Sequence, residues 1–221
     1  MGAAHLPGPA EVAAETTLPA STSPLGLGRG RDGLVHVPAG LPRDRPVPLL
    51  VLLHGAGSTG AAMLAALVAH GAELPGLVLA PDSRGRTWDL ILGGFGPDVA
   101  FLGQALESVC SRAAVDLERI VLAGFSDGAS YVLSLGLSNG DLFRRLVAFS
   151  PGFMAPGAAR GRPSIFMSHG AADAVLPVAR CSRRLVPALR AAGYDVRYEE
   201  FDGGHVVPPD IGRAALACAT A

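Results

Sequence analysis

Lysine is absent from this 221-residue sequence, and all 18 of its basic residues are arginines. The 19 acidic residues bring the formal net charge to −1, so neither a nucleic-acid-binding surface nor a basic membrane-binding patch is indicated. Exclusive use of arginine is compatible with bidentate binding of anions, but a compositional bias of the source genome is the simpler interpretation. The composition therefore predicts small-molecule partners, and no nucleic acid or membrane among them.

Cysteine is also scarce. Cys110, Cys181 and Cys218 are odd in number and far apart, which fits neither a disulfide framework nor a metal site, and we interpret them as buried thiols. No run of 18 apolar residues could span a membrane, and the N-terminus lacks the basic and apolar regions of a signal peptide. A cytoplasmic location is expected.

The chain divides into a leader and one domain. Residues 1–24 are rich in Ala, Pro, Thr and Ser without periodicity, which predicts a flexible N-terminal leader. Residues 25–221 are expected to form a single domain. Its glycine-rich start, Leu25 to Gly33, follows no apolar strand, so we interpret it as a hairpin turn before an edge strand at 34–37 and not as a dinucleotide-binding loop.

Strands and helices then alternate. Short apolar runs predict strands at 49–53, 77–80, 120–123, 145–149, 164–167 and 194–201, and helical spacing predicts helices at 61–70, 98–112, 129–137, 178–192 and after Pro209. This alternation indicates an α/β fold with a mostly parallel sheet covered by helices on both faces. Ligands of such sheets bind at the carboxyl ends of the strands.

The strand at 120–123 leads directly into Gly124-Phe-Ser-Asp-Gly128 and then a helix. Glycines two residues before and after Ser126 allow a strained turn that holds the serine oxygen above the sheet edge. The next amide, that of Asp127, points to the same place from the start of the helix. Ser126 is therefore the candidate nucleophile.

A second glycine-rich turn, His54-Gly-Ala-Gly57, follows the strand at 49–53. Backbone amides at this position of a parallel sheet can stabilise an oxyanion. The amide of Ala56 is the expected donor beside Asp127, and that of Gly57 is a second candidate. We interpret His54 as a side chain that packs under the turn.

A serine nucleophile needs a base, and the base needs a carboxylate to fix its tautomer. Asp173 follows the strand at 164–167 and His205 follows the strand at 194–201. Both should therefore lie at the carboxyl ends of the strands, as Ser126 does. We predict that Asp173 is the acid and His205 the base.

Three competing residues lie nearby. His169 is close to Asp173 in sequence, but its position before a glycine at a strand end favours bracing of the turn. Asp202 and Asp210 flank His205, and a neighbour on the same loop rarely points back at the imidazole.

Apolar side chains on the loops 84–96 and 151–162 are expected to wall a shallow pocket that accepts a few methylenes. For Trp88, a place in a packing cluster is equally compatible with the sequence. The predicted substrate-binding residues are Trp88, Phe95, Phe153, Met154 and Leu176.

From about Leu34 onwards, the sequence resembles the α/β-hydrolase superfamily, and specifically the phospholipase/carboxylesterase family of small esterases. The resemblance rests on the order Ser126, Asp173, His205 and on the segments His54-Gly-Ala-Gly, Gly-Phe-Ser-Asp-Gly and His169-Gly-Ala-Ala-Asp. It implies a nucleophile, acid and base at those three positions, and oxyanion amides at Ala56 and Asp127.

The resemblance further implies hydrolysis of carboxylic esters through an acyl-enzyme, without a metal or cofactor. Because no cap-sized insertion is present, short to medium acyl esters are the expected substrates. A lysophospholipase, a thioesterase or a polyester hydrolase would use the same residues, and a non-catalytic binding protein of the same fold remains an alternative.

Overall fold

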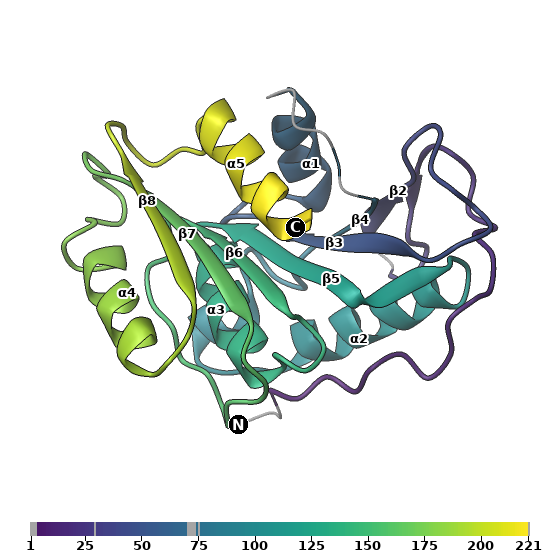
Figure 1. The fold of residues 1–221 in the computed structure, drawn as a ribbon, viewed down its shortest axis with the longest axis horizontal. Coiled ribbons are helices and arrows are strands. Elements are labelled where there is room, and N and C mark those ends of the chain that lie inside the picture. Colours follow the sequence, from purple (N-terminus) through teal and green to yellow (C-terminus); the bar gives the residue numbers. More distant parts are fainter. Residues whose placement is uncertain (1–3, 29, 70–73, 75, 221) are drawn as a thin grey trace.

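The computed structural model describes residues 4–28, 30–69, 74 and 76–220. Its centre is an eight-stranded sheet in the order β1-β2-β4-β3-β5-β6-β7-β8 (Figure 1). The strands are β1 (Thr22–Pro24), β2 (Gly33–His36), β3 (Val47–Leu53), β4 (Leu77–Pro81), β5 (Val115–Phe125), β6 (Arg145–Phe149), β7 (Ser164–Gly170) and β8 (Val196–Phe201). Strands β3 to β8 are parallel to one another, whereas β2 pairs antiparallel with both β4 and β1 at one edge.

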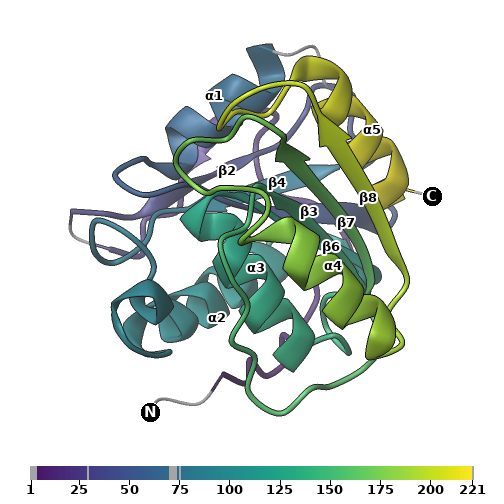
Figure 2. The ribbon, with the colours of Figure 1, turned by 90° about the vertical axis from the view of Figure 1, so that its left-hand side faces the viewer.

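Helices cover both faces of the sheet, as the alternation predicts. They are α1 (Gly60–Ala69), α2 (Pro97–Cys110), α3 (Asp127–Ser138), α4 (Ser182–Ala191) and α5 (Pro209–Thr220), with a short 3-10 turn η1 (Asp89–Leu92) before α2. Figure 2 shows α1 and α5 on one face and α2, α3 and α4 on the other. None of the helices in the described ranges is both long and apolar enough to cross a membrane.

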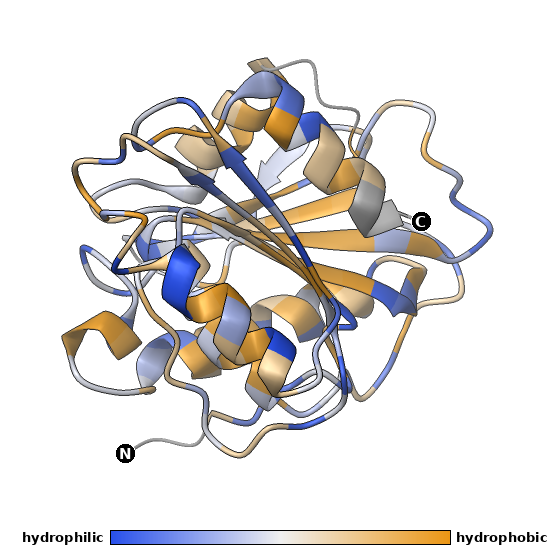
Figure 3. Cartoon of the chain, turned by 60° about the vertical axis from the view of Figure 1, so that its left-hand side comes forward, coloured by the Kyte–Doolittle hydropathy of each residue, from blue (hydrophilic) through white to orange (hydrophobic). Residues whose placement is uncertain are grey.

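Two apolar cores follow from this arrangement. Successive side chains of a strand point to opposite faces, so Leu49, Val51 and Leu53 of β3 join the core under α2 and α3. Leu50 and Leu52 join the core under α1 and α5. The central strands are buried on both faces, and their sequences are therefore unbroken apolar runs. The edge strand β8 is largely hydrophilic (Figure 3).

The N-terminal segment differs from the expected flexible leader. From residue 4 onwards it runs along the domain, where Leu6 and Leu18 are buried against the core of α2 and α3. The Ala13 amide donates to the Cys110 carbonyl over 2.8 Å, and β1 pairs with β2. Strand β2 is therefore not the edge strand that the sequence predicts, because β1 lies outside it.

Some element boundaries also differ. The helix expected at 178–192 begins only at Ser182, because the backbone turns between Pro177 and Cys181 before entering it. His70, the expected end of the first helix, lies outside the described residues. Cys110 and Cys181 are buried, as predicted.

Candidate active site

Ser126 occupies the tight turn between β5 and α3. Its backbone has φ 57° and ψ −120°, a conformation that is strained for a residue with a side chain. Its amide donates to the Phe149 carbonyl over 2.9 Å. The flanking glycines are required sterically: a Cβ on Gly128 would lie 2.5 Å from the His54 carbonyl oxygen, and one on Gly124 would lie 2.7 Å from the Gly128 carbonyl carbon.

His205 connects Ser126 to Asp173. Its Nε2 lies 2.9 Å from Ser126 Oγ, and its Nδ1 lies 2.6 Å from Asp173 Oδ2. Because a carboxylate only accepts, Nδ1 carries the proton, which leaves Nε2 free to accept the serine hydroxyl proton. The Asp173 side chain is fully buried, whereas that of His205 is 14% exposed. The arrangement can therefore take up the proton of the serine hydroxyl.

The Asp173 carboxylate is held in its ionised form. Burial favours the protonated acid, but the amides of Leu176 and Val175 donate to Oδ1 over 2.8 and 2.9 Å, and His205 donates to Oδ2. These hydrogen bonds outweigh the desolvation, so the pKa of Asp173 is lowered. Asp173, and not Asp202 or Asp210, is the carboxylate within hydrogen-bonding distance of the imidazole.

His169 braces the turn that carries Asp173. It is completely buried at the end of β7, with Nδ1 2.8 Å from Ser182 Oγ and Nε2 2.7 Å from the Leu176 carbonyl. Since a carbonyl only accepts, Nε2 carries a proton. This is the bracing position that the sequence favours for His169.

The proposed oxyanion amides flank Ser126. A Cβ on Gly55 would lie only 3.3 Å from Ser126 Cβ, so the turn that contains Ala56 runs directly beside the serine. Among the described residues no acceptor is bonded to the Ala56 amide, and Asp127 is the first residue of α3, whose amide has no acceptor within the helix. Gly57 does not fit this role, because its amide donates to the Arg86 carbonyl over 2.8 Å.

His54 supports this turn from below, as the sequence suggests. Its ring is buried, Nδ1 donates to the Gly55 carbonyl over 2.7 Å, and Nε2 accepts from the Ser83 amide over 3.0 Å. Burial lowers the pKa of His54, which favours the neutral ring that this pattern requires.

Trp88 does not line a substrate pocket. Its side chain is fully buried, its indole N–H donates to the His54 carbonyl over 2.8 Å, and its ring packs against Tyr131 at 5.2 Å. The packing alternative is therefore the correct one. Met154 and Leu176 are partly buried, Met154 against the core of α3 and Leu176 against Gly152, where a Cβ would lie 3.3 Å away.

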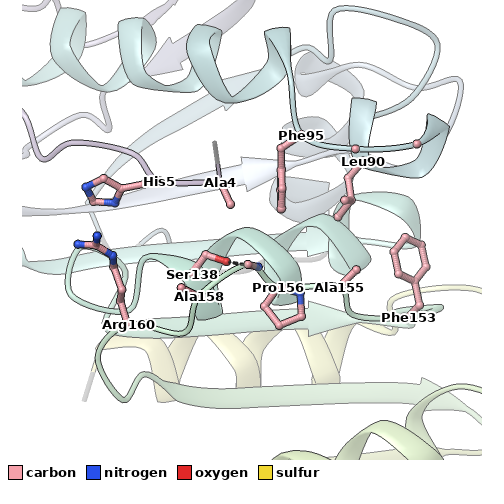
Figure 4. A pocket seen from close by; sticks show the side chains of 13 residues that line it. Ala4, His5, Leu90, Phe95, Ser138, Phe153, Ala155, Pro156, Ala158 and Arg160 are labelled. Carbon is pink, nitrogen blue, oxygen red and sulfur yellow. Dashed lines mark hydrogen bonds between the residues drawn. The ribbon is translucent and has the colours of Figure 1, made fainter. Parts of the chain in front are cut away.

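Phe95 and Phe153 line a long apolar cavity of about 610 Å³ (Figure 4). This cavity is larger than the shallow pocket expected from the sequence. Its other lining residues were missed, because most of them are small residues in loops without any pattern: Ala4, His5, Leu90, Gly93, Gly94, Ser138, Ala155, Pro156, Gly157, Ala158 and Arg160. A smaller hollow of about 300 Å³ adjoins His205, between α1 and the loop after β8.

No group of three or more His, Cys, Asp or Glu side chains that could hold a metal ion occurs in the part of the chain that the structure describes. The groups that meet at the site are a serine hydroxyl, an imidazole and a carboxylate.

Comparison with known proteins agrees with this geometry. A sequence model of the family described as Phospholipase/Carboxylesterase matches residues 100–211, just over half of the chain and the part that contains all three residues of the hydrogen-bonded series. No curated protein sequence matches the chain.

Similar solved structures cover most of the chain. A carboxylesterase from Mesorhizobium loti has a TM-score of 0.69 at 20% identity and covers 89% of this chain and 99% of its own. The esterase PE8 has a TM-score of 0.68 at 24% identity, covering 84% and 96%. A phospholipase/carboxylesterase from Dyadobacter fermentans has a TM-score of 0.66 at 21% identity, covering 88% and 99%. At these identities the likeness concerns the fold.

Proposed function

The chain belongs to the phospholipase/carboxylesterase family and has the α/β-hydrolase fold, and we propose that it hydrolyses carboxylic esters with Ser126, His205 and Asp173. It is a serine ester hydrolase by family. The observation that carries the residue assignment is the continuous hydrogen-bonded series from Ser126 Oγ through the imidazole to the Asp173 carboxylate, at 2.9 and 2.6 Å.

In the first half of the reaction, Ser126 Oγ attacks the ester carbonyl carbon and passes its proton to His205 Nε2. The negative charge that develops on the carbonyl oxygen is stabilised by the amides of Ala56 and Asp127. The ionised Asp173 stabilises the imidazolium. When the tetrahedral intermediate collapses, Nε2 returns the proton to the departing alkoxide, and the acyl group stays on the serine.

The second half repeats these steps with water. His205 removes a proton from the water as it attacks the acyl-enzyme carbonyl, and the same two amides receive the charge. Collapse releases the carboxylic acid and restores the serine hydroxyl. Every proton moves between Ser126, His205, water and substrate, so these residues are sufficient for the cycle.

We propose small-molecule esters with short to medium acyl groups as the substrates. In support, no cap-sized insertion separates the strands and helices of the described residues. A lysophospholipase, a thioesterase or a polyester hydrolase would share the proposed chemistry and differ only in substrate. The cytoplasmic location remains a prediction.

Hydrolysis of p-nitrophenyl acetate tests this function and separates an esterase from a binding protein of the same fold. The wild type should release nitrophenolate with saturable kinetics, and Ser126→Ala should lose about 10⁴-fold or more of kcat/KM. Ser58→Ala, at a partly exposed serine near the turn of Ala56, is the matched control and should retain activity. Equal activity of wild type and Ser126→Ala would refute the assignment.

A further inference from the structure

The half-buried side chain of Arg31 reaches from the glycine-rich turn before β2 to the end of β3. Its Nε donates to the Ser83 carbonyl over 2.6 Å, and its Nη2 donates to the Ser58 carbonyl over 2.8 Å. The same Nη2 lies 3.2 Å from His54 Nε2. One guanidinium group therefore joins His54 at the strand end, the far end of the turn that carries Ala56, and the segment after β4.

The backbone that carries Arg31 is itself held in place. The Asp32 carboxylate accepts the amides of residues 26–28 over 2.7 to 3.0 Å, which ties the glycine-rich turn together. The Arg84 guanidinium donates to the Arg31 carbonyl and stacks 3.4 Å from the centre of the Phe101 ring. This turn before β2, for which the sequence suggests no chemistry, therefore presents Arg31 from a fixed position.

The contacts of His54 determine where its proton lies. A guanidinium and a backbone amide only donate, and His54 Nε2 faces both the Arg31 guanidinium and the Ser83 amide, so Nε2 carries no proton. The proton is on Nδ1, which donates to the Gly55 carbonyl over 2.7 Å. Burial, and to a smaller extent the charge of Arg31, lowers the pKa of His54 and keeps the ring neutral.

The Gly55 carbonyl and the Ala56 amide belong to the same peptide group. Because a trans peptide group is planar, its C=O and N–H point in opposite directions, and a bond that fixes one also fixes the other. The Gly55 carbonyl accepts from His54 Nδ1 and, over 3.2 Å, from the Ser58 amide. The orientation of the Ala56 N–H therefore depends on the proton that His54 carries on Nδ1.

We propose that Arg31 is a positioning residue for the oxyanion amide of Ala56. It acts through His54, whose Nε2 it faces, and through the Ser58 carbonyl at the end of the turn. This rests on the proposed function, in which the Ala56 amide stabilises the charge of the tetrahedral intermediate. None of the hydrogen bonds of Arg31 within the described ranges involves Ser126, so the effect passes through the turn.

Substitution of Arg31 tests the proposal against a matched arginine. Arg31→Met removes every donor but keeps an aliphatic side chain. Arg43→Met is the control, because Arg43 also donates to two backbone carbonyls, over 2.9 Å each, but precedes β3, at the end of that strand away from Ser126. With p-nitrophenyl acetate, Arg31→Met lowers kcat on the order of tenfold with little change in KM, because the amide acts on the transition state. Arg43→Met keeps the wild-type kcat.

A thiono ester reports on the oxyanion amides themselves. In the thiono analogue of p-nitrophenyl acetate, sulfur replaces the carbonyl oxygen and receives the developing charge, and sulfur is a weak hydrogen-bond acceptor. The amides therefore contribute less to its hydrolysis. The oxygen-to-sulfur ratio of kcat/KM should fall in Arg31→Met and match the wild type in Arg43→Met. An unchanged ratio in Arg31→Met would mean that Arg31 only stabilises the fold, which would overturn the proposal.

A double-mutant cycle tests the path through His54. Because His54→Leu removes both ring nitrogens, Arg31→Met should lower kcat less in that background than in the wild type. Losses in kcat that simply add would overturn the proposal.

Arg31→Lys keeps the charge and one donor group, so its kcat and its oxygen-to-sulfur ratio should lie between those of Arg31→Met and the wild type. Beside Arg43→Lys, it provides the comparison if Arg31→Met or His54→Leu does not fold. Equal ratios in Arg31→Lys, Arg43→Lys and the wild type would also overturn the proposal.

Failure of the proposed function gives a different result, in which Ser126→Ala still hydrolyses p-nitrophenyl acetate. If Ser126→Ala is inactive and the Arg31 variants match the wild type, the proposed function stands and the role of Arg31 is refuted.

Discussion

His169 Nε2 lies 3.3 Å from Asp173 Oδ2, the same carboxylate oxygen that accepts the proton of His205 Nδ1. The acid of the proposed triad therefore has an imidazole on either side. The His169 ring is fixed by Ser182 and by the Leu176 carbonyl, so its N–H stays directed at the turn that carries Asp173. We infer that His169 is a positioning residue for the acid.

Replacing His169 tests this role. His169→Phe keeps an aromatic ring but leaves the Leu176 carbonyl and the Ser182 hydroxyl without their partner, which should cost about 1–3 kcal/mol of unfolding free energy. It should also lower kcat more than it raises KM, because the carboxylate is less well held. His169→Gln, whose amide can donate to the same carbonyl, should recover part of both losses. Equal kcat for His169→Phe, His169→Gln and the wild type would show that His169 does not position the acid.

The Asp173 carboxylate should stay ionised from pH 5 to pH 9. The lowered pKa of Asp173 keeps that carboxylate ionised throughout this range. The stabilisation that Asp173 provides is fully present above its unfolded pKa of about 3.9 and is lost as pH falls through the lower folded value. Urea unfolding measured from pH 6 down to pH 2 should show this loss of stability, and an Asp173→Asn variant with the same pH dependence as the wild type would contradict it.

Trp88 should act on stability and not on substrate choice. Trp88→Phe retains an aromatic ring between His54 and Tyr131 but loses the hydrogen bond to the His54 carbonyl. We expect a loss of about 1–3 kcal/mol in urea unfolding and an unchanged octanoate-to-butyrate ratio of kcat/KM. A changed ratio with unchanged stability would restore Trp88 as a substrate contact.

Part of the fold and of the site could be predicted from the sequence. The turn at Ser126 is encoded locally, because the apolar strand, the glycines and the helix all lie within about fifteen residues. Asp173 and His205 follow neighbouring strands, so the rule that parallel strands end at one edge predicts that they meet there. The hydrogen bonds that join them agree with this prediction.

What the sequence could not predict depends on contacts between distant segments. Leu6 is held at the end of α3, where its amide donates to Asn139 Oδ1 over 2.7 Å. Nothing in the sequence near residue 6 indicates this contact. The sequence places Trp88 in a loop, but the groups that it contacts, the His54 carbonyl and the Tyr131 ring, lie in distant parts of the chain. The cavity that Phe95 and Phe153 line has mostly small residues around it, and its walls form only when segments distant in the sequence pack together.

The glycine after the serine is required by backbone crowding. In Gly128→Ala the new methyl group would lie 2.5 Å from the His54 carbonyl oxygen and 2.6 Å from that of Leu53, and neither backbone atom can move without shifting β3. We expect a loss of about 1–3 kcal/mol of stability, together with reduced kcat, because the turn of Ala56 moves relative to Ser126. Thermal unfolding and p-nitrophenyl acetate kinetics measure the two effects. Gly8→Ala, at an open position, is the control and should change neither.

Covalent labelling identifies the nucleophile directly. The wild-type protein would be treated with a fluorophosphonate probe, digested and mapped by mass spectrometry, beside Ser126→Ala and His205→Ala. If Ser126 is the nucleophile, we expect a single modified site at Ser126 in the wild type, no labelling of Ser126→Ala, and slow labelling of His205→Ala because the hydroxyl has lost its base. Labelling at Ser58, Ser83 or Ser150, or equal labelling of wild type and Ser126→Ala, would contradict it.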